Sequence, residues 1–110
     1  MAFKIVISKT VKFKVKGTFK DEAGVDQPFD FTLTCNRLDQ EQINDKLLGN
    51  DLLVREFLQT VVTDWSGVQD ENGHPMPFTV EALQDMFRLP GMPMLVMRTY
   101  LAEVGAKEKN

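Results

Sequence analysis

The sequence predicts an α+β fold in which an N-terminal antiparallel β-meander of two or three strands packs against about four C-terminal α-helices. Apolar and polar residues alternate over about 3–36, which is the pattern of strands with one buried face. Apolar residues then recur at three- and four-residue steps over about 39–105, the pattern of amphipathic helices. A chain of 110 residues has the length of one domain. We therefore expect one domain over 1–110, with 106–110 as a frayed tail.

The predicted strands fall in three segments of regular alternation. These are 3–7, 11–16 and 29–35. Between the last two, Asp21-Glu22-Ala23-Gly24 is polar and offers a glycine for the positive φ of a hairpin connection. Pro28 stands at the beginning of the returning strand, where a missing N–H is tolerated. Ser8-Lys9-Thr10 interrupts the alternation and is either a tight turn or a bulge in one long strand.

Two helices are expected next. Asp39 and Gln42 have the spacing of a capping box, and Gly49 is a suitable end for the helix that they begin. Asn50 or Asp51 is expected to cap a second, stronger helix that runs to Trp65. Its apolar face consists of Leu53, Val54, Phe57, Leu58, Val61, Val62 and Trp65.

Residues 65–83 form the most distinctive stretch of the sequence. A loop rich in glycine and proline is expected from Trp65 to Phe78, after which the hydroxyl of Thr79 caps a third helix. Phe78 and Leu83 occupy the two positions of a hydrophobic staple, which fixes the angle at which the chain enters that helix. The loop is therefore expected to hold a defined shape.

The third helix is short, because Leu89-Pro90-Gly91 stops it. Pro93 fits the first turn of a final helix, which closes near Gly105. The apolar stripe of this last helix is Met94, Met97, Leu101 and Val104, widened by Val96 and Tyr100.

The composition offers few groups for catalysis. Cys35 is the only cysteine and His74 the only histidine, so neither a disulfide nor a zinc site is expected. Cys35 shares the apolar parity of its strand and should be buried. No nucleotide-binding or hydrolase motif is present. We expect no enzyme activity, no catalytic residue and no cofactor or metal.

The sequence also indicates a compartment. No apolar run approaches the roughly 18 residues of a membrane span. The start Met1-Ala-Phe-Lys lacks the plan of a secretory signal. A cytoplasmic protein without a membrane partner is expected.

Charge is distributed unevenly along the chain. The first twenty residues contain six lysines and no acid, whereas the whole chain has a net charge of −3. Lys12, Lys14 and Lys16 alternate with apolar residues, as expected for the solvated face of a strand that guards a sheet edge. Alternatively, they form a docking face for an acidic partner or for another copy of the chain. Nucleic acid is the weakest option, because no exposed aromatics are interleaved with the lysines.

Five of the six methionines lie between positions 76 and 97. Core filling is the default interpretation of such a cluster. Flexible thioethers also suit surfaces that adapt to varied apolar partners. Met92, Met94 and Met97 are therefore the candidate contact surface, with Trp65 and Phe78 as supports of the loop. Trp65 itself is expected to lie in the core.

The stretch around the loop resembles a known family. The residues that carry the resemblance are Trp65, Gly67, Val68, Gly73, Pro75, Pro77, Phe78, Thr79, Glu81 and Leu83, followed by the Pro90-Gly91 break and a C-terminal helix with Tyr100. This order is similar to that of the tail assembly chaperones of long-tailed bacteriophages and prophages. The order of an N-terminal sheet and several helices is also similar to that family.

The resemblance implies a non-enzymatic role in the cytoplasm of an infected bacterium. Such chaperones bind the long, helical tape-measure protein and keep it soluble until the tail tube polymerises around it. They are not expected in the mature virion. The implied partners are the tape-measure protein, a frameshift-extended form of the chain and further copies in a homo-oligomer. The alternatives are a small structural tail or head–tail joining component and, more distantly, a bacterial adaptor module.

Overall fold

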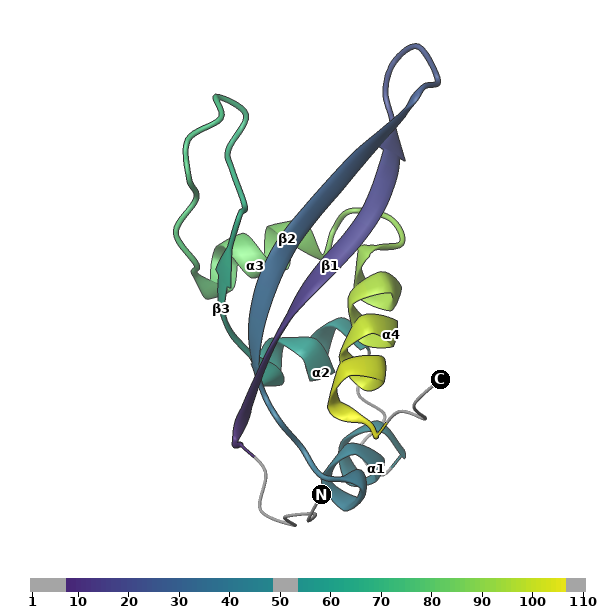
Figure 1. Cartoon of the computed structure of the whole chain (residues 1–110), viewed down its shortest axis with the longest axis vertical. Helices are drawn as coiled ribbons and strands as arrows, with labels where there is room; N and C mark the ends of the chain where they lie inside the picture. The colour runs from purple at the N-terminus through teal and green to yellow at the C-terminus, as the bar shows by residue number, and fades with distance from the viewer. Residues whose placement is uncertain (1–7, 49–53, 107–110) are drawn as a thin grey trace, which may run out of the picture.

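The computed structural model describes residues 8–48 and 54–106, and within them it has the expected α+β architecture (Figure 1). The described elements are β1 (Thr10–Lys20), β2 (Asp26–Asn36), α1 (Gln40–Leu48), α2 (Val54–Val61), β3 (Val62–Ser66), α3 (Val80–Met86) and α4 (Met92–Val104). The predicted fold class is therefore confirmed. The strand predicted over 3–7 lies outside the described residues, as do the helix end at Gly49 and the cap at Asn50 or Asp51.

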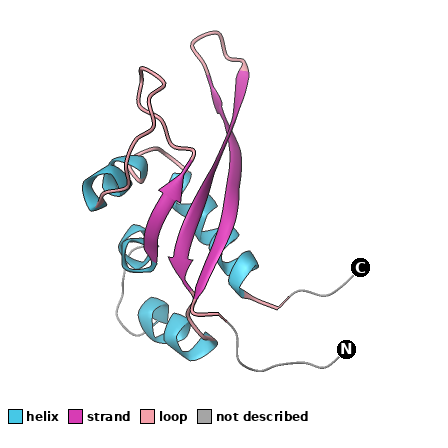
Figure 2. Cartoon of the chain, turned by 60° about the vertical axis from the view of Figure 1, so that its left-hand side comes forward, coloured by secondary structure: helices cyan, strands magenta, loops and turns pink. Residues whose placement is uncertain are grey.

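The three strands form an antiparallel sheet in the order β1-β2-β3. β1 and β2 pair along their whole length, from Thr10 opposite Asn36 to Lys20 opposite Asp26. β3 pairs only with the Thr32–Cys35 part of β2. The sheet is consequently three-stranded at one end, and only the β1–β2 ribbon continues to the other end (Figure 2).

The predicted helix up to Trp65 is wrong, because α2 ends at Val61 and the chain continues as β3. The β-branched run from Val61 to Thr63 favours extended backbone. The buried positions of β3 are nevertheless three residues apart, at Val62 and Trp65. The register shift between Thr34 and Cys35 causes this spacing, since it leaves Thr63 as an extra residue. A bulged strand thus imitates the spacing of a helix.

The core lies between one face of the sheet and the helices. α4 lies against β1, and α2 lies against α4 and α3. Tyr100 of α4 is fully buried, and its ring lies 6.3 Å from that of Phe13 and 5.9 Å from that of Phe57. Its hydroxyl donates to the Asn36 carbonyl (2.8 Å) and accepts from the Leu38 amide (3.3 Å). Tyr100 therefore joins α4, α2 and the end of β2.

The predicted starts of α1, α3 and α4 are confirmed. The Gln42 amide donates to Asp39 Oδ1 (2.8 Å), and the Asp39 amide donates to Gln42 Oε1 (3.0 Å), as in a capping box. The Ala82 amide donates to Thr79 Oγ1 (3.0 Å) at the start of α3. Gly91 precedes α4 with a φ of 82°, and a proline stands in its first turn.

The hairpin connection also forms as expected. Gly24 has a φ of 79°. The Asp21 carboxylate accepts hydrogen bonds from the amides of Ala23 (2.9 Å) and Val25 (3.0 Å). These bonds stabilise its charged form, so the pKa of Asp21 lies below its ordinary value. At the opposite end of β1, Ser8 Oγ donates to the Thr10 carbonyl (2.8 Å), and the choice between a turn and a bulge there stays open.

Candidate functional site

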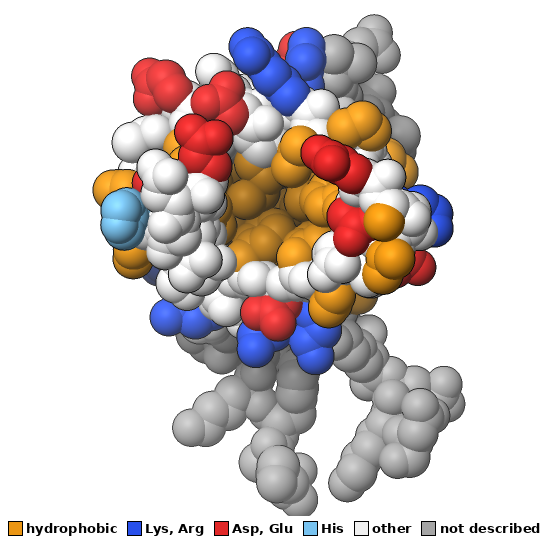
Figure 3. Space-filling view, turned by 90° about the horizontal axis from the view of Figure 1, so that it is seen from above, with side chains coloured by type: hydrophobic (Ala, Val, Ile, Leu, Met, Phe, Trp, Pro, Cys, Tyr) orange, Lys and Arg blue, Asp and Glu red, His pale blue; other side chains and the backbone are white. Residues whose placement is uncertain are grey.

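An apolar hollow opens at the end of the molecule where the β1–β2 ribbon and the 67–78 loop project (Figures 1 and 3). It has a volume of about 360 Å³. Its floor and walls contain four aromatic side chains, three methionines and a leucine. These are Phe19, Phe29, Phe31, Trp65, Met76, Met86, Met92 and Leu89. Figure 3 shows the hollow as an orange depression inside a mostly polar rim.

One wall is a row of phenylalanine rings on the inner face of the ribbon. The rings of Phe19 and Phe29 are stacked at 5.0 Å, and those of Phe29 and Phe31 at 6.1 Å. Gly17, opposite Phe29 in the ribbon, makes this row fit, because a Cβ there would lie 2.6 Å from Phe29 Cζ. The glycine leaves room for the ring to lie across the neighbouring strand.

The opposite wall is the 67–78 loop, which is held by its own hydrogen bonds. The Met76 amide donates to the Val68 carbonyl (2.8 Å), and Gln69 pairs with Pro75 as an isolated antiparallel bridge. The Asp70 carboxylate accepts from the amides of Asn72 (2.9 Å) and His74 (3.0 Å). This part of the loop is a compact hairpin.

Trp65 joins this loop to the core. Its Nε1–H donates to the Met76 carbonyl (2.8 Å), and its ring meets Phe78 edge-on at 5.3 Å. Gly67, with a φ of 80°, lets the chain turn back close to Phe31, since a Cβ there would lie 3.6 Å from Phe31 Cα. Trp65 is 7% exposed, so its predicted core position is confirmed.

The structure separates the three methionines that the sequence grouped together. Met92 and Met97 are 3% and 5% exposed, whereas Met94 is 50% exposed and lies away from the hollow. The three methionines do not form a single accessible stripe, because the buried side of α4 follows Met92, Val96 and Tyr100. Their contact with a partner stays a prediction. Met92 alone of the three reaches the hollow, where Met76 and Met86 join it.

The hollow has one acidic side chain in its lining, Asp85, and no basic one. Asp30 also borders the hollow, but it alternates with Phe29 and Phe31 and stands opposite Lys16, so its side chain lies on the other face of the sheet. Asp85 lies 3.9 Å from Arg88, with both side chains largely exposed. Such an exposed pair contributes little, so the carboxylate remains available to another cation.

Lys12, Lys14 and Lys16 lie on the opposite face of the sheet. All three are exposed on β1, which is one of the two edge strands of the described sheet. Lys14 stands opposite Thr32, and Lys16 opposite Asp30. This polar face is separate from the hollow, and its role in self-association stays a prediction.

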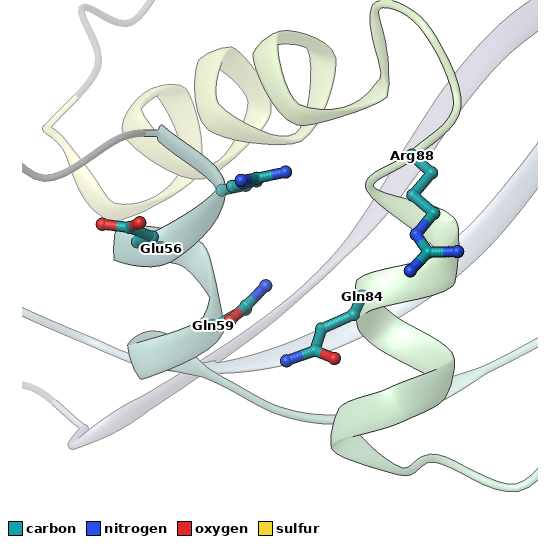
Figure 4. A pocket seen from close by; sticks show the side chains of 5 residues that line it. Glu56, Gln59, Gln84 and Arg88 are labelled. Atoms are coloured by element: carbon teal, nitrogen blue, oxygen red, sulfur yellow. The ribbon is translucent and has the colours of Figure 1, made fainter.

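A second depression lies between α2 and α3 and is polar (Figure 4). It has a volume of about 260 Å³ and is lined by Arg55, Glu56, Gln59, Gln84 and Arg88. Gln59 and Gln84 extend from the two helices into the gap, and Glu56 points away from it. All of these except Gln59 are exposed, so water competes for any ligand that they hold.

Metal ligation and thiol chemistry depend on particular side chains of the described residues. No three His, Cys, Asp or Glu side chains within 8–48 and 54–106 lie where they would hold a metal ion. Cys35 is fully buried, and burial raises the pKa of its thiol to about 12, which leaves it protonated near neutral pH. No helix in the described part of the chain is long and apolar enough to cross a membrane.

Sequence reasoning did not find the main residues of the hollow. Phe19, Phe29, Met76, Met86 and Leu89 have ordinary strand, loop and helix positions in the sequence. The available signal was the apolar alternation of the ribbon, which continues to Phe19. This makes the apolar face of the ribbon longer than a short helix can cover. Only the pairing of β3 with part of β2 shows where the cover ends.

The fold and the hollow define a small α+β protein whose distinctive surface is an apolar recess. The sequence model of the family described as YdaY prophage protein matches residues 30–100, and the chain belongs to that family. It is therefore a prophage protein. Searches of curated proteins and of solved structures give no match. The matched range extends from Asp30 in β2 to Tyr100 in α4 and includes the loop wall of the hollow.

Proposed function

We propose that this prophage protein is a tail assembly chaperone that binds the tape-measure protein through the hollow and keeps it soluble during tail tube assembly. The observation that carries the proposal is the accessible Phe- and Met-lined recess. Prophage membership supports the biological setting. The resemblance of the 65–83 stretch to tail assembly chaperones supports the specific role.

The hollow has the physical properties that such a role requires. A tape-measure protein exposes apolar helical faces that associate with one another unless they are covered. Met76, Met86 and Met92 have flexible side chains that can fit different apolar residues along such a client. The phenylalanine row of the ribbon and the 67–78 loop provide two sides between which a helix face can be held.

The test is co-expression with the large helical protein encoded next to this chain, followed by measurement of the client's soluble fraction. Phe19→Ser/Leu89→Ser removes two partly exposed residues of the hollow, which are 39% and 43% exposed. Leu101→Ser/Val80→Ser is the matched control, with 39% and 54% exposure outside the lining. Circular dichroism establishes that both variants are folded.

We expect the client to remain soluble with the wild type and with the control variant, and to precipitate with the hollow variant. Equal client solubility with both variants would remove the hollow from the proposal. If the chain binds no client and is instead found in purified particles, the alternative of a structural tail or head–tail joining component replaces the chaperone. Analysis of the purified particles also tests the proposed absence of the protein from the mature virion.

A further inference from the structure

We infer that the polar depression between α2 and α3 binds a carboxylate or phosphate group through Arg55 and Arg88. This inference goes beyond the proposed function and does not rest on it, because no residue of the depression lines the hollow. Three features of the described residues support it. They are the matching arrangement of arginine and glutamine on the two helices, the unneutralised charge of the arginines and the packed core beneath them.

Each helix contributes one arginine and one glutamine to the depression. Arg55 and Gln59 are four residues apart on α2, and Gln84 and Arg88 are four residues apart at the end of α3. The Arg88 amide donates to the Asp85 carbonyl (3.2 Å), so the chain still turns like a helix at Arg88. A separation of four residues places two side chains on the same face of a helix. Two cations and two amides therefore border one space.

The positive charge of the depression is not neutralised by the protein. Within 8–48 and 54–106, no acidic side chain forms an ion pair with Arg55. Arg88 has only the 3.9 Å contact to Asp85, in which both side chains are largely exposed. Glu56 lines the depression but points away from it (Figure 4). Two cations thus share one depression in a chain whose net charge is −3, and an anion between them would relieve their repulsion.

The helices that carry these side chains are fixed by the core. α2 and α3 lie against each other. Phe57 and Leu58 of α2 are fully buried, as is Leu83 of α3, and Phe87 is 5% exposed. A ligand therefore has to order the arginine and glutamine side chains but not the backbone that carries them, which lowers the cost of binding.

The side-chain chemistry suits an oxyanion. A guanidinium has forked N–H donors that match two oxygens of a carboxylate or phosphate group. The side-chain amides of Gln59 and Gln84 form no hydrogen bond with another described residue, so their NH₂ groups are further donors. A volume of about 260 Å³ accommodates one such group together with water.

The exposure of the depression bears on the source of the oxyanion. All lining residues except Gln59 are exposed, so a free anion should bind weakly. An acidic side chain carried by a protein partner should bind more tightly, because the other contacts of that partner raise its effective concentration. Free phosphate and a protein carboxylate are thus two sources of the same chemistry.

The experiment follows the side-chain N–H signals of the full-length, ¹⁵N-labelled protein by NMR. Sodium phosphate is the first probe, with sodium chloride at the same ionic strength as its reference. The second probe is a short helical peptide with two glutamates four residues apart, and its reference is the same peptide with glutamines. We expect phosphate and the glutamate peptide to shift the signals of Arg55, Arg88, Gln59 and Gln84, and the two references to leave them in place.

Two double variants and a control locate the site. Arg55→Gln/Arg88→Gln should weaken binding about 2- to 30-fold, the range for two exposed ion pairs. Arg55→Lys/Arg88→Lys keeps the charge without the forked donors and should recover only part of this loss. Lys12→Gln/Arg98→Gln removes the same charge at exposed positions of β1 and α4 and should leave binding unchanged. Circular dichroism establishes that all three variants are folded.

Three outcomes would overturn the inference. These are equal shifts with chloride and phosphate, equal weakening by Arg55→Gln/Arg88→Gln and the control, or shifts confined to residues outside the depression. Tighter binding of the glutamate peptide than of phosphate would support the site and identify an acidic group of a protein partner as its ligand. Binding of phosphate without the peptide would support the site and identify the free anion. The client assay tests the hollow alone, so either proposal can fail without the other.

Discussion

The two ends of the β1–β2 ribbon have the same alternating sequence pattern but differ in burial. At the three-stranded end, where α4 lies against β1, Phe13 and Leu33 are 5% and 0% exposed. At the other end, Phe19 is 39% exposed and stacks on Phe29 at the edge of the hollow. The difference arises outside the ribbon, because β3 stops at Ser66 and the chain leaves as a loop. Alternation predicts an apolar face, and the remaining chain determines whether that face becomes core or binding surface.

The largest effect should come from removing one phenylalanine at each end of the same strand. Phe13→Ala creates a cavity under Tyr100 and should lower the free energy of unfolding by about 3–5 kcal/mol. Phe19→Ala should cost about 1 kcal/mol, since it loses mainly one ring stack. Urea denaturation followed by circular dichroism measures both. Similar losses for the two variants would mean that the two ends are equally packed.

Trp65→Ala should affect both the three-stranded end of the sheet and the hollow. Trp65 pairs with Leu33 in the sheet and donates a hydrogen bond to the Met76 carbonyl in the loop wall. We expect a loss of about 3–5 kcal/mol from the cavity. Trp65→Phe keeps much of the ring volume and removes the Nε1–H donor. It should therefore cost less while loosening the loop wall. Unchanged melting of Trp65→Ala would contradict the central position of this residue.

Alkaline pH should lower the free energy of unfolding through Cys35, which is buried at the three-stranded end of the sheet. Burial raises the pKa of its thiol from the ordinary 9.0 to about 12 in the fold, so the unfolded chain loses this proton first. This contribution to stability is fully present below about pH 9 and is lost as pH rises toward 12. Burial also raises the pKa of Tyr100, which acts in the same direction.

Cys35→Ala is the matched variant for this pH dependence. The difference in its free energy of unfolding from wild type should narrow between about pH 9 and 12, because the variant lacks the thiol. Urea midpoints across that interval measure the difference. An unchanged difference between the two proteins would show that the thiol is not desolvated in the fold.

The local features of this fold were predictable, and the features that depend on distant segments were not. The Asp39–Gln42 capping box and the Thr79 cap depend on residues three positions apart, so the sequence contains the whole signal. The pattern of β3 predicts a helix instead of a strand, because the bulge at Thr63 puts the buried Val62 and Trp65 three residues apart. The hollow could not be predicted, since it depends on which part of β2 the strand β3 reaches.

The smallest effect on stability, and a specific effect on the hollow, should come from Gly17→Ala. A Cβ at this position would lie 2.6 Å from Phe29 Cζ and 3.0 Å from Leu95 Cδ2, which are both ends of flexible side chains that can move. Alanine also reduces the freedom of the unfolded chain, by about 0.4–1 kcal/mol where it fits. The gain and the lost ring contacts oppose each other, so we expect a net change within about 1 kcal/mol.

The hollow should nevertheless respond to Gly17→Ala. When the Phe29 ring is displaced, the row that it forms with Phe19 and Phe31 is interrupted, and the shape of the hollow changes. The soluble fraction of the co-expressed client should fall while the urea midpoint stays nearly constant. Gly105→Ala is a glycine control outside the hollow, where the added Cβ would meet only the Leu101 carbonyl at 3.1 Å. Equal client solubility with Gly17→Ala and wild type would show that the phenylalanine row does not shape the binding surface.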